Sequence, residues 1–545
     1  MKLKERLVAT VVGAIVFFLL LIFTFSMLYY SETFPTDGSN VFRNHGTFIR
    51  RTMSGKLHRS LPKRIKEDNE THRDSNHAGE IELTDREYEE LLNSNHMLPK
   101  KLSKSPFGKS SPFPTSKSPL KQRFMKECLK PKKSKDPGDT REEFRDLVKI
   151  LQEKEVISKI REIIKGRTRI TIQEIHSIET ETNLTVMDQF HLGISDLDLY
   201  AENDVTVDNL MDQMVKMPIV HVEEKEGGTQ LKLLITFQDG SQAMFKPMRF
   251  DRDKETEPNH FYFVDYERHN SEIATFHLDR ILGFRRCPPV VGRKLNITTE
   301  IYAVADDELL KTFFISPAEN LCFHGHCSYY CDTSHAICGK PDTIEGSVAA
   351  FLPPDSLSGR KSWKNPWKRS YHKRRKAEWE VNDDFCEIAR RKFPMYDFTK
   401  RLADLIDTTI LDFLIGNMDR HHYETFKIFG NDSFIVHLDH GRGFGKSKHD
   451  EVSILAPLYQ CCFVHASTFY RLLQLQLNPI KLSTLMRCSL YRDPLNPILL
   501  DPHLEALDRR LEKVLQVIRD CFQSHDVNDV LYYDSDLDDG PFSYS

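Results

Sequence analysis

The sequence predicts an α+β fold with two lobes, stabilised by disulfides and preceded by a membrane anchor and a disordered stem. Three observations support this class. A hairpin pattern around Asp239-Gly240 is followed by a series of amphipathic helical patterns. All of the 11 cysteines except Cys128 lie in the later part of the chain, and an uncharged apolar run stands near the N-terminus. At 545 residues, one large two-lobed unit with a tail fits the length.

Residues 7–30 form the apolar run and predict a transmembrane signal anchor. As a helix, this run exceeds the roughly 30 Å hydrocarbon core of a bilayer. Lys2, Lys4 and Arg6 precede it, so residues 1–6 are expected to stay cytosolic and the remainder to enter the secretory lumen. A cleaved signal peptide is the alternative, and it gives the same compartment. Four sequons follow the run, and their candidate glycosylation sites are Asn69, Asn183, Asn296 and Asn431.

Residues 31–140 are predicted to be a disordered lumenal stem. Within them, residues 98–137 are dense in Lys, Ser and Pro and cannot bury enough apolar surface to offset their ordering entropy. Residues 531–545 are predicted to be an acidic tail. The formal net charge of −4 is nearly balanced for a chain of this size, so composition predicts no nucleic-acid partner.

The cysteines predict disulfides, because an oxidising lumen favours bridges over free thiols. Four of them crowd into one loop that also holds His324 and His326, so a zinc site is the competing interpretation there. The lumenal compartment favours disulfides. The cysteines of this set are Cys322, Cys327, Cys331 and Cys338 in the loop and Cys386, Cys461, Cys462 and Cys521 further on.

The globular part is divided into two predicted regions. Residues 141–348 are expected to form a helical N-terminal segment and a small lobe, and residues 349–530 a large lobe. In the small lobe, the apolar runs 230–237 and 242–245 flank Asp239-Gly240, which predicts a hairpin. Amphipathic spacing predicts helices at 146–166, 266–281, 398–414 and 504–521.

The functional prediction depends on separated charged side chains. Lys246 ends a predicted strand, and Asp419 follows a long amphipathic helix. Asp439 ends a short apolar run that is expected to form a strand. A lysine for the phosphates, then a carboxylate for the attacking hydroxyl, then a carboxylate for a metal is the order found in kinases. Glu267 and Glu272 lie at the start of the intervening helix, and spacing alone leaves either one open as the partner of the lysine or the metal.

Other features differ from those of an ordinary kinase. The sequence has no G-x-G-x-x-G loop, only Gly227-Gly228. Glu424 stands where an ordinary kinase has a metal-binding Asn, and a carboxylate there suits a hard cation and favours manganese. His421 and His422 are weaker alternative ligands, because adjacent side chains on a loop diverge. Each of these groups taken singly is more often a solvated surface residue, so the prediction depends on their joint order.

Several longer motifs resemble one kinase family. They are Phe245-Lys246-Pro247-Met248, Tyr266-Glu267-Arg268-His269-Asn270, Phe276-His277-Leu278-Asp279-Arg280-Ile281-Leu282, Gly416-Asn417-Met418-Asp419-Arg420-His421-His422-Tyr423-Glu424 and Ser453-Ile454-Leu455-Ala456-Pro457-Leu458. Together these motifs resemble the secretory-pathway kinases of the family with sequence similarity 20, over roughly residues 227–521, and its protein-kinase branch most strongly. The resemblance implies an atypical two-lobed protein-kinase-like fold that uses ATP with Mn²⁺, with Mg²⁺ as the alternative cation.

The resemblance also implies roles for individual residues. Asp419 becomes the catalytic aspartate, and Glu267 and Asp439 become the metal ligands, which decides between Glu267 and Glu272 by analogy alone. The implied nucleotide contacts, including a hinge at residues 349–352, are Gln230, Lys246, Glu267, Ala349, Ala350, Phe351, Leu352, Glu424 and Asp439. The implied disulfides are Cys322–Cys338, Cys327–Cys331, Cys386–Cys461 and Cys462–Cys521, with Cys128, Cys287 and Cys488 left free.

The expected activity is that of a serine/threonine protein kinase acting on Ser-x-Glu motifs of acidic secreted proteins. The expected location is the Golgi membrane, as a single-pass type II protein, with secretion after proteolytic release as an alternative. A homodimer or a heterodimer with a pseudokinase paralogue is the expected assembly. The alternative functions are a xylose kinase of proteoglycan linkers and a catalytically weak pseudokinase partner.

Two details of the resemblance bear on these alternatives. Glu267 favours an active protein kinase, because the resembling pseudokinases carry Gln at that position and the sugar kinases carry Asp. His440 stands where the family usually has Asn, beside the predicted metal carboxylate. In addition, the basic run Lys373–Lys376 is expected to attract acidic substrates by electrostatic steering, with a solvated loop as the alternative interpretation.

Overall fold

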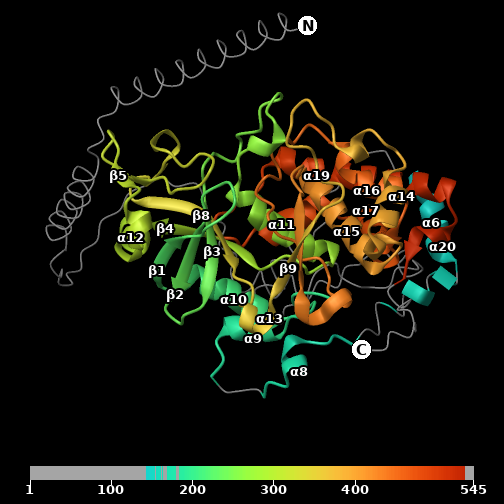
Figure 1. Ribbon diagram of the computed structural model, residues 1–545, viewed down its shortest axis with the longest axis horizontal. Helices are drawn as coiled ribbons and strands as arrows, with labels where there is room; N and C mark the ends of the chain where they lie inside the picture. The colour runs from blue at the N-terminus through green and yellow to red at the C-terminus, as the bar shows by residue number, and fades with distance from the viewer. Residues whose placement is uncertain are drawn as a thin grey trace, which may run out of the picture. The chain divides into compact units, whose positions relative to one another are not determined.

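The computed structural model describes residues 143–153, 155–156, 158–160, 163, 168–179 and 183–533 (Figure 1). The predicted cytosolic tail, anchor and stem, the sequon at Asn69 and residues 534–545 of the predicted acidic tail lie outside these residues. Within the described part of the chain, no helix combines the length and the apolar character needed to cross a membrane.

A five-stranded sheet with the order β1-β2-β3-β8-β4 forms one part of the fold, and its paired strands are all antiparallel. The predicted hairpin is confirmed as β2 and β3, joined through Gly240 at a φ of 82°. The predicted boundary between residues 348 and 349 falls inside β8. The strands are β1 (Ile219–Glu224), β2 (Leu233–Phe237), β3 (Gln242–Pro247), β4 (Val290–Asn296) and β8 (Thr343–Ala350).

Helix α11 (His269–Leu282) packs between this sheet and the helical part of the fold. It contacts β4 and β8 on one side and helices α15, α17 and α18 on the other. Every residue of α11 except Arg280 is buried, as expected for a helix enclosed on several faces. Figure 1 shows α11 between the strands and the helices near the C-terminus. Side chains at the start of α11 can therefore reach both parts of the fold.

The helical part confirms the predicted helices at 398–414 and 504–521, which become α15 and α19. All residues of α15 are buried, so this helix is a central element of the core. The helices of this part are α14 (Phe385–Lys392), α15 (Lys400–Ile415), α16 (Ala456–Cys461), α17 (Ala466–Leu477), α18 (Leu482–Leu490), α19 (Asp501–Ser524) and α20 (Val527–Val530).

The remaining elements are short. Three small sheets are β5-β6-β7, β9-β10 and the parallel pair β11-β12. Their strands are β5 (Phe313–Ile315), β6 (Leu321–Phe323), β7 (Ile337–Cys338), β9 (Arg360–Lys364), β10 (His422–Phe426), β11 (Val464–His465) and β12 (Leu531–Tyr532). The other helices are α6 (Arg145–Gln152), α8 (Ile172–His176), α9 (Val186–Leu192), α10 (Val205–Lys216), α12 (Asp307–Leu310) and α13 (Asp355–Ser358). The short 3₁₀ and π-helical segments are η2 (Tyr262–Val264), η3 (Ile297–Ile301), η4 (Tyr302–Val304), η5 (Thr333–His335), η6 (Glu378–Glu380), η7 (Pro394–Tyr396), η8 (Lys427–Asp432) and η9 (Val452–Leu455).

The four predicted disulfides are confirmed: Cys322–Cys338, Cys327–Cys331, Cys386–Cys461 and Cys462–Cys521. They exclude a zinc site made of the four loop cysteines. Cys287 is free and buried, as expected, but Cys488 is disulfide-bonded, so the prediction that it is free is wrong. The adjacent residues Cys461 and Cys462 tie α16 to α14 and to α19, which closes the helical part covalently.

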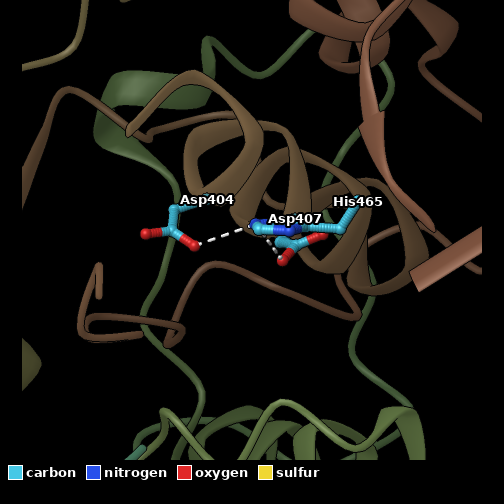
Figure 2. A group of neighbouring side chains, drawn as sticks. All are labelled: Asp404, Asp407 and His465. Carbon is cyan, nitrogen blue, oxygen red and sulfur yellow. Dashed lines mark hydrogen bonds and ion pairs between the residues drawn. The ribbon is translucent and has the colours of Figure 1, made fainter. Parts of the chain in front are cut away.

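A buried ion-pair network in the helical part involves Asp404 and Asp407 of α15 and His465 of β11 (Figure 2). These residues have the chemistry of metal ligands. However, Arg286 lies 3.1 Å from a carboxylate oxygen of each aspartate, and Lys400 Nζ lies 2.7 Å from Asp404 Oδ2. Because these cations already balance the carboxylates, we interpret the network as part of the core rather than as a metal site.

Two of the described sequons lie on the surface, at Asn183 and Asn431, which are exposed. Asn296 is half-buried, and its Oδ1 accepts hydrogen bonds from the main-chain amides of Thr298 and Thr299. Glycosylation at each of these positions stays a prediction.

Candidate active site

The predicted lysine and carboxylates meet in one cluster, although they come from separate segments. Lys246 Nζ lies 2.6 Å from Glu272 Oε1, 3.1 Å from Asp439 Oδ1 and 3.2 Å from Glu267 Oε2. Burial disfavours the charge of Lys246, but the three carboxylates outweigh burial and raise its pKa well above the ordinary value. Lys246 is therefore a largely buried cation, 16% exposed, that three anions hold, and not a solvated surface lysine.

The positions of the cluster follow from the elements that carry it. Lys246 lies on β3 and pairs with Ser347 of β8. Glu272 is in the first turn of α11, and Glu267 lies just before that helix. Because α11 packs against β8, its N-terminal end brings both glutamates to the lysine.

Asp439 reaches the cluster through an unusual backbone. Its φ of 60° is in the left-handed region, which costs a non-glycine residue about 1 kcal/mol or more. The predicted strand before Asp439 is not formed: Val436 makes only an isolated bridge to Glu424. Gly441 then passes close to Glu267: a Cβ added to Gly441 would lie 3.0 Å from the Cβ of Glu267. The Gly441 carbonyl also accepts a hydrogen bond from Arg268 N at 2.7 Å. These contacts hold Asp439 and Glu267 against each other.

The two glutamates that the sequence left open differ in their surroundings. Glu272 has the shorter bond to Lys246, a side chain only 9% exposed, and a second contact from His440 N at 3.3 Å. Glu267 is 17% exposed and Asp439 is 60% exposed, so these two carboxylates present oxygens toward the open side of the cluster. Glu272 is thus the fixed partner of the lysine.

The cluster fits a divalent cation. Three carboxylates surround one ammonium, which leaves two negative charges in excess. Burial, supported by Asp439 and Glu272, raises the pKa of Glu267, whereas Lys246 holds the pKa of Asp439 well below its ordinary range. Carboxylate oxygens are the ligands that Mg²⁺ and Mn²⁺ prefer, so the donor set matches the predicted metal.

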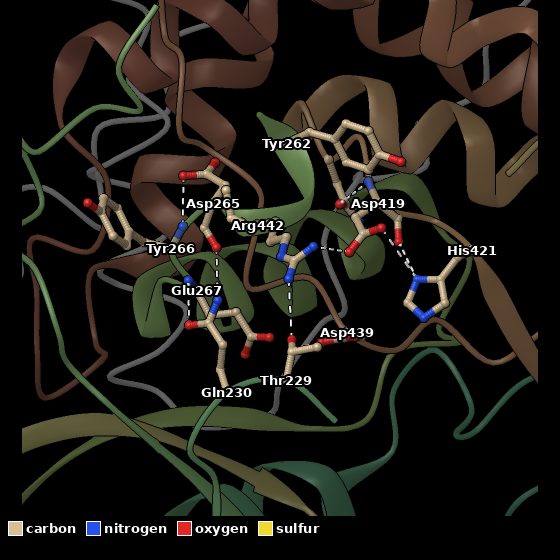
Figure 3. Close-up of polar contacts among 12 residues, drawn as sticks. Thr229, Gln230, Tyr262, Asp265, Tyr266, Glu267, Asp419, His421, Asp439 and Arg442 are labelled. Atoms are coloured by element: carbon tan, nitrogen blue, oxygen red, sulfur yellow. Dashed lines mark hydrogen bonds and ion pairs between the residues drawn. The ribbon is translucent and has the colours of Figure 1, made fainter. Parts of the chain in front are cut away.

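Asp419 lies beside this cluster, after the C-terminus of α15 at Gly416 (Figure 3). Its main-chain amide donates to Asn417 Oδ1 at 3.0 Å, and Arg442 Nη1 bonds its Oδ2. Its Oδ1 is buried and receives no hydrogen bond from any described residue, with His421 Nδ1 at 3.5 Å. One oxygen of Asp419 is therefore held, and the other is available to a ligand.

Arg442 connects Asp419 to the loop before β2. Besides Asp419, it bonds Thr229 Oγ1 through Nη2 at 3.4 Å, and Figure 3 shows its guanidinium between these two residues. Sequence reasoning missed Arg442, although it stands in the run Gly441-Arg442-Gly443, where glycines mark a close approach of the backbone.

Arg420, also missed, joins the segments that carry Asp419 and Asp439. It makes a two-pronged ion pair with Asp412 of α15 at 2.8 and 2.9 Å, and its Nη1 donates to the carbonyl of Leu438. His440 Nδ1 lies 3.2 Å from Arg420 Nη2. Burial, together with Arg420, lowers the pKa of His440 to about 4, so this imidazole is neutral at pH 7 and adds no charge beside Asp439.

Gln230 joins the site through the backbone rather than through the carboxylates. Its Nε2 donates to Asp265 O at 2.8 Å, and its Oε1 accepts from Glu267 N at 3.2 Å. Gln230 is buried and thus fixes the chain that carries Glu267. Its role as a nucleotide contact stays a prediction.

The remaining predicted nucleotide contacts come from β10, from the end of β8 and from the residues after it, and their roles stay predictions. Glu424 is on β10, and its Oε2 accepts from Arg360 Nε at 2.7 Å; no contact among the described residues joins it to the Lys246 cluster. Ala349 and Ala350 are the last residues of β8. Phe351 follows, with its amide donating to Gln242 O at 3.2 Å and its carbonyl 2.8 Å from His191 Nε2. The hinge role of residues 349–352 stays a prediction.

The alternative histidine ligands do not form a pair. His421 lies against Asp419, whereas His422 starts β10 and is exposed. The Asp419 carboxylate 3.5 Å from Nδ1, together with the hydrogen bond of Nδ1 to the Asp419 main-chain carbonyl, raises the pKa of His421 above its ordinary value.

The fold and the site together define a kinase-like protein. A strand lysine bonded to a glutamate of a packed helix, with two aspartates on the following segments, is the arrangement that kinases use for ATP and a metal. The family model described as "Fam20C: Golgi casein kinase, C-terminal, Fam20" matches residues 185–530. The chain belongs to the Fam20 family.

Individual relatives support the same placement. The chain is 57% identical over 365 residues to the Drosophila melanogaster "Extracellular serine/threonine protein CG31145", covering 67% of this chain and 69% of that protein. It is 58% identical over 351 residues to the human "Extracellular serine/threonine protein kinase FAM20C", covering 64% of this chain but only 60% of that protein. The crystal structure of the Golgi casein kinase with Mn/ADP bound aligns with a TM-score of 0.67 and 43% identity, over 74% of this chain and 97% of that chain.

Proposed function

We propose that this protein is a secretory-pathway serine/threonine protein kinase that transfers the γ-phosphate of ATP to serine in Ser-x-Glu segments of secreted proteins. The observation that carries the proposal is the convergence of Lys246, Glu267, Glu272 and Asp439 beside Asp419. The named activities of the relatives and the Mn/ADP complex of the related crystal structure support it. The predicted anchor at residues 7–30 is consistent with a Golgi location.

Each residue of the cluster has a role in this proposal. Glu272 holds Lys246 in place, and Lys246 contacts the phosphates of ATP. Glu267 and Asp439 hold Mn²⁺, since their oxygens face the open side of the cluster. When bound, the cation neutralises charge on the phosphates. A glutamine at position 267 would supply no charge, so Glu267 favours an active enzyme over a pseudokinase.

Asp419 orients the acceptor. Arg442 holds its Oδ2, and its Oδ1 accepts a hydrogen bond from the serine hydroxyl. The serine oxygen then forms a bond to the γ-phosphorus while the bond from that phosphorus to the bridging oxygen of ADP breaks, and the hydroxyl proton passes to Asp419. Most of the rate gain comes from this positioning, as is usual in phosphoryl transfer.

The test offers two acceptors to the full-length protein with MnCl₂ and radiolabelled ATP. One is a Ser-x-Glu peptide and the other a xylosylated acceptor, because relatives include a protein named glycosaminoglycan xylosylkinase as well as a pseudokinase. We expect label on the peptide and its loss in Asp419→Asn. Label on the xylosylated acceptor alone, or on neither, would overturn the proposal.

A further inference from the structure

A cavity of about 520 Å³ opens beside Asp419. This volume is within the range of ordinary ligand pockets. Tyr262, Asp419 and Arg442 are among its lining residues, together with members of the basic run Lys373–Lys376 and Lys446. Because Asp419 lines the cavity, an acceptor whose hydroxyl reaches Asp419 has to occupy it. The charges of the cavity therefore act on the residues that flank the phosphorylated serine.

The cations of the cavity are of two kinds. Arg442 is bonded to Asp419, and Arg369 donates to Ser453 Oγ at 2.7 Å and lies 3.9 Å from Glu380. The other cations make no ion pair with any residue in the described part of the chain; they are Lys373, Arg375, Lys376 and Lys446.

The carboxylates of the same cavity already interact with groups other than these four unpaired cations. Asp419 is bonded to Arg442, and Asp265 lies 3.5 Å from Arg268. Glu451 accepts from Ser453 and lies 3.3 Å from His449. The cavity thus presents positive charge that its own side chains leave unbalanced, which favours an anionic group on the ligand.

Lys446 differs from the other unpaired cations in its backbone. The buried Arg510 donates to the Lys446 carbonyl through Nη2 at 2.7 Å and to the Leu414 carbonyl through Nη1 at 2.9 Å. Lys446 is half-buried, whereas Lys373, Arg375 and Lys376 are exposed. A lysine on a backbone held by a buried arginine loses less freedom on binding than one on an exposed loop.

An extended acceptor would bring the second residue after the serine into the cavity that Asp419 and Lys446 both line. In an extended chain, side chains two residues apart point to the same side and lie about 7 Å apart. When the serine of a Ser-x-Glu segment faces Asp419, the glutamate two residues later faces the same cavity.

From the unpaired charge, the held backbone and this spacing, we propose that Lys446 is a specificity-determining residue that binds the carboxylate of the second residue after the phosphorylated serine. This inference rests on the proposed kinase function and extends it to the reading of the substrate.

The test compares two peptides that differ only in Glu or Gln at the second position after serine. Both are given to the full-length wild type and to Lys446→Ala, with Mn²⁺ and ATP. We expect kcat/KM for the Glu peptide to fall roughly tenfold to hundredfold, the range for one charge-assisted hydrogen bond, and the rate with the Gln peptide to stay unchanged. Lys446→Arg should retain the preference for Glu.

Lys448→Ala is the matched control, since Lys448 is an exposed lysine on the same segment that does not line the cavity. We expect it to behave as the wild type. If Lys446→Ala loses its fold, Lys446→Gln gives the same comparison with the side-chain length kept. The proposal is overturned if the Lys446 variant slows both peptides equally or neither. A wild type that labels neither peptide would instead remove the proposed function itself, and this inference with it.

Discussion

Exchanging Glu267 for Gln tests which carboxylate holds the divalent cation. Gln keeps the shape of Glu267 and removes only its charge. Lys246 retains two partners in this variant, Glu272 at 2.6 Å and Asp439 at 3.1 Å, so the lysine stays in place. We expect the folded structure to survive and the affinity for Mn²⁺ to fall.

The size of this effect follows from the charges of the cluster. The substitution halves the excess negative charge that three carboxylates leave around one ammonium. A unit charge about 4 Å from a divalent cation, at an effective dielectric constant of about 20, is worth about 8 kcal/mol as an upper bound. Substituting a residue that only hydrogen-bonds a metal ligand already lowers metal affinity about 10–100-fold. Losing a direct ligand should therefore cost at least about 100-fold, or about 2.7 kcal/mol.

The assay measures the phosphorylation rate against Mn²⁺ concentration at saturating ATP, together with direct Mn²⁺ binding followed by electron paramagnetic resonance. Glu272→Gln is the matched control, because it removes the same single charge from the partner that makes the shortest ion pair with Lys246. We expect this control to raise KM for ATP and lower stability while shifting the Mn²⁺ midpoint less than tenfold. The reasoning is refuted if Glu272→Gln shifts the midpoint more than Glu267→Gln does.

Further predictions address the acceptor, the covalent frame and the pH dependence. Asp419→Asn should lower kcat by about 10²–10⁴ and leave KM for ATP unchanged, as steady-state kinetics would show; loss of ATP binding would contradict it. Replacing Cys462 and Cys521 by Ser should lower the unfolding free energy by about 4 kcal/mol, because the bridge spans 59 residues. Denaturant unfolding measures this loss, Cys287→Ala is the control, and a loss below about 1 kcal/mol would argue against it. The carboxylate and main-chain carbonyl of Asp419 raise the pKa of His421. The contribution of this interaction to stability is therefore complete below the ordinary histidine pKa of about 6.5 and is lost as pH rises through the raised value. The wild type should therefore exceed His421→Gln in stability more at pH 5.5 than at pH 8.5, and an equal difference at both pH values would exclude this contribution.

The parts of the fold that the sequence predicted are those with a local signal. The long buried helix α15 and the hairpin of β2 and β3 are recorded in the spacing of apolar residues and in Asp239-Gly240, so short windows of sequence are enough to find them. The prediction of a strand before Asp439 was wrong because it depended on a local signal alone. Its apolar run is buried, but a strand needs a neighbour along its length, and only Val436 has one.

The candidate site was predicted in its residue types and order, and less well in its contacts. Glu424 illustrates the limit, because its sequence position suggested a nucleotide contact but gave no sign of its bond to Arg360 of β9; its role toward the nucleotide stays a prediction. The pairing of the disulfides came from the family resemblance, and the residues alone left it open. The resemblance in turn gave no indication that Cys488 is bonded.

By itself, the sequence determined the covalent and periodic features of this protein: cysteines suited to an oxidising compartment, helices with a buried stripe, and a lysine and aspartates in kinase order. Only the tertiary structure decided which of these charges meet. Lys246 and Asp439 are 193 positions apart, and the first turn of α11 and the residues just before it supply the glutamates between them. Their contact depends on how that helix packs between the sheet and the helical part. The free energy of such packing is spread over the whole core, and so no short segment of sequence records it.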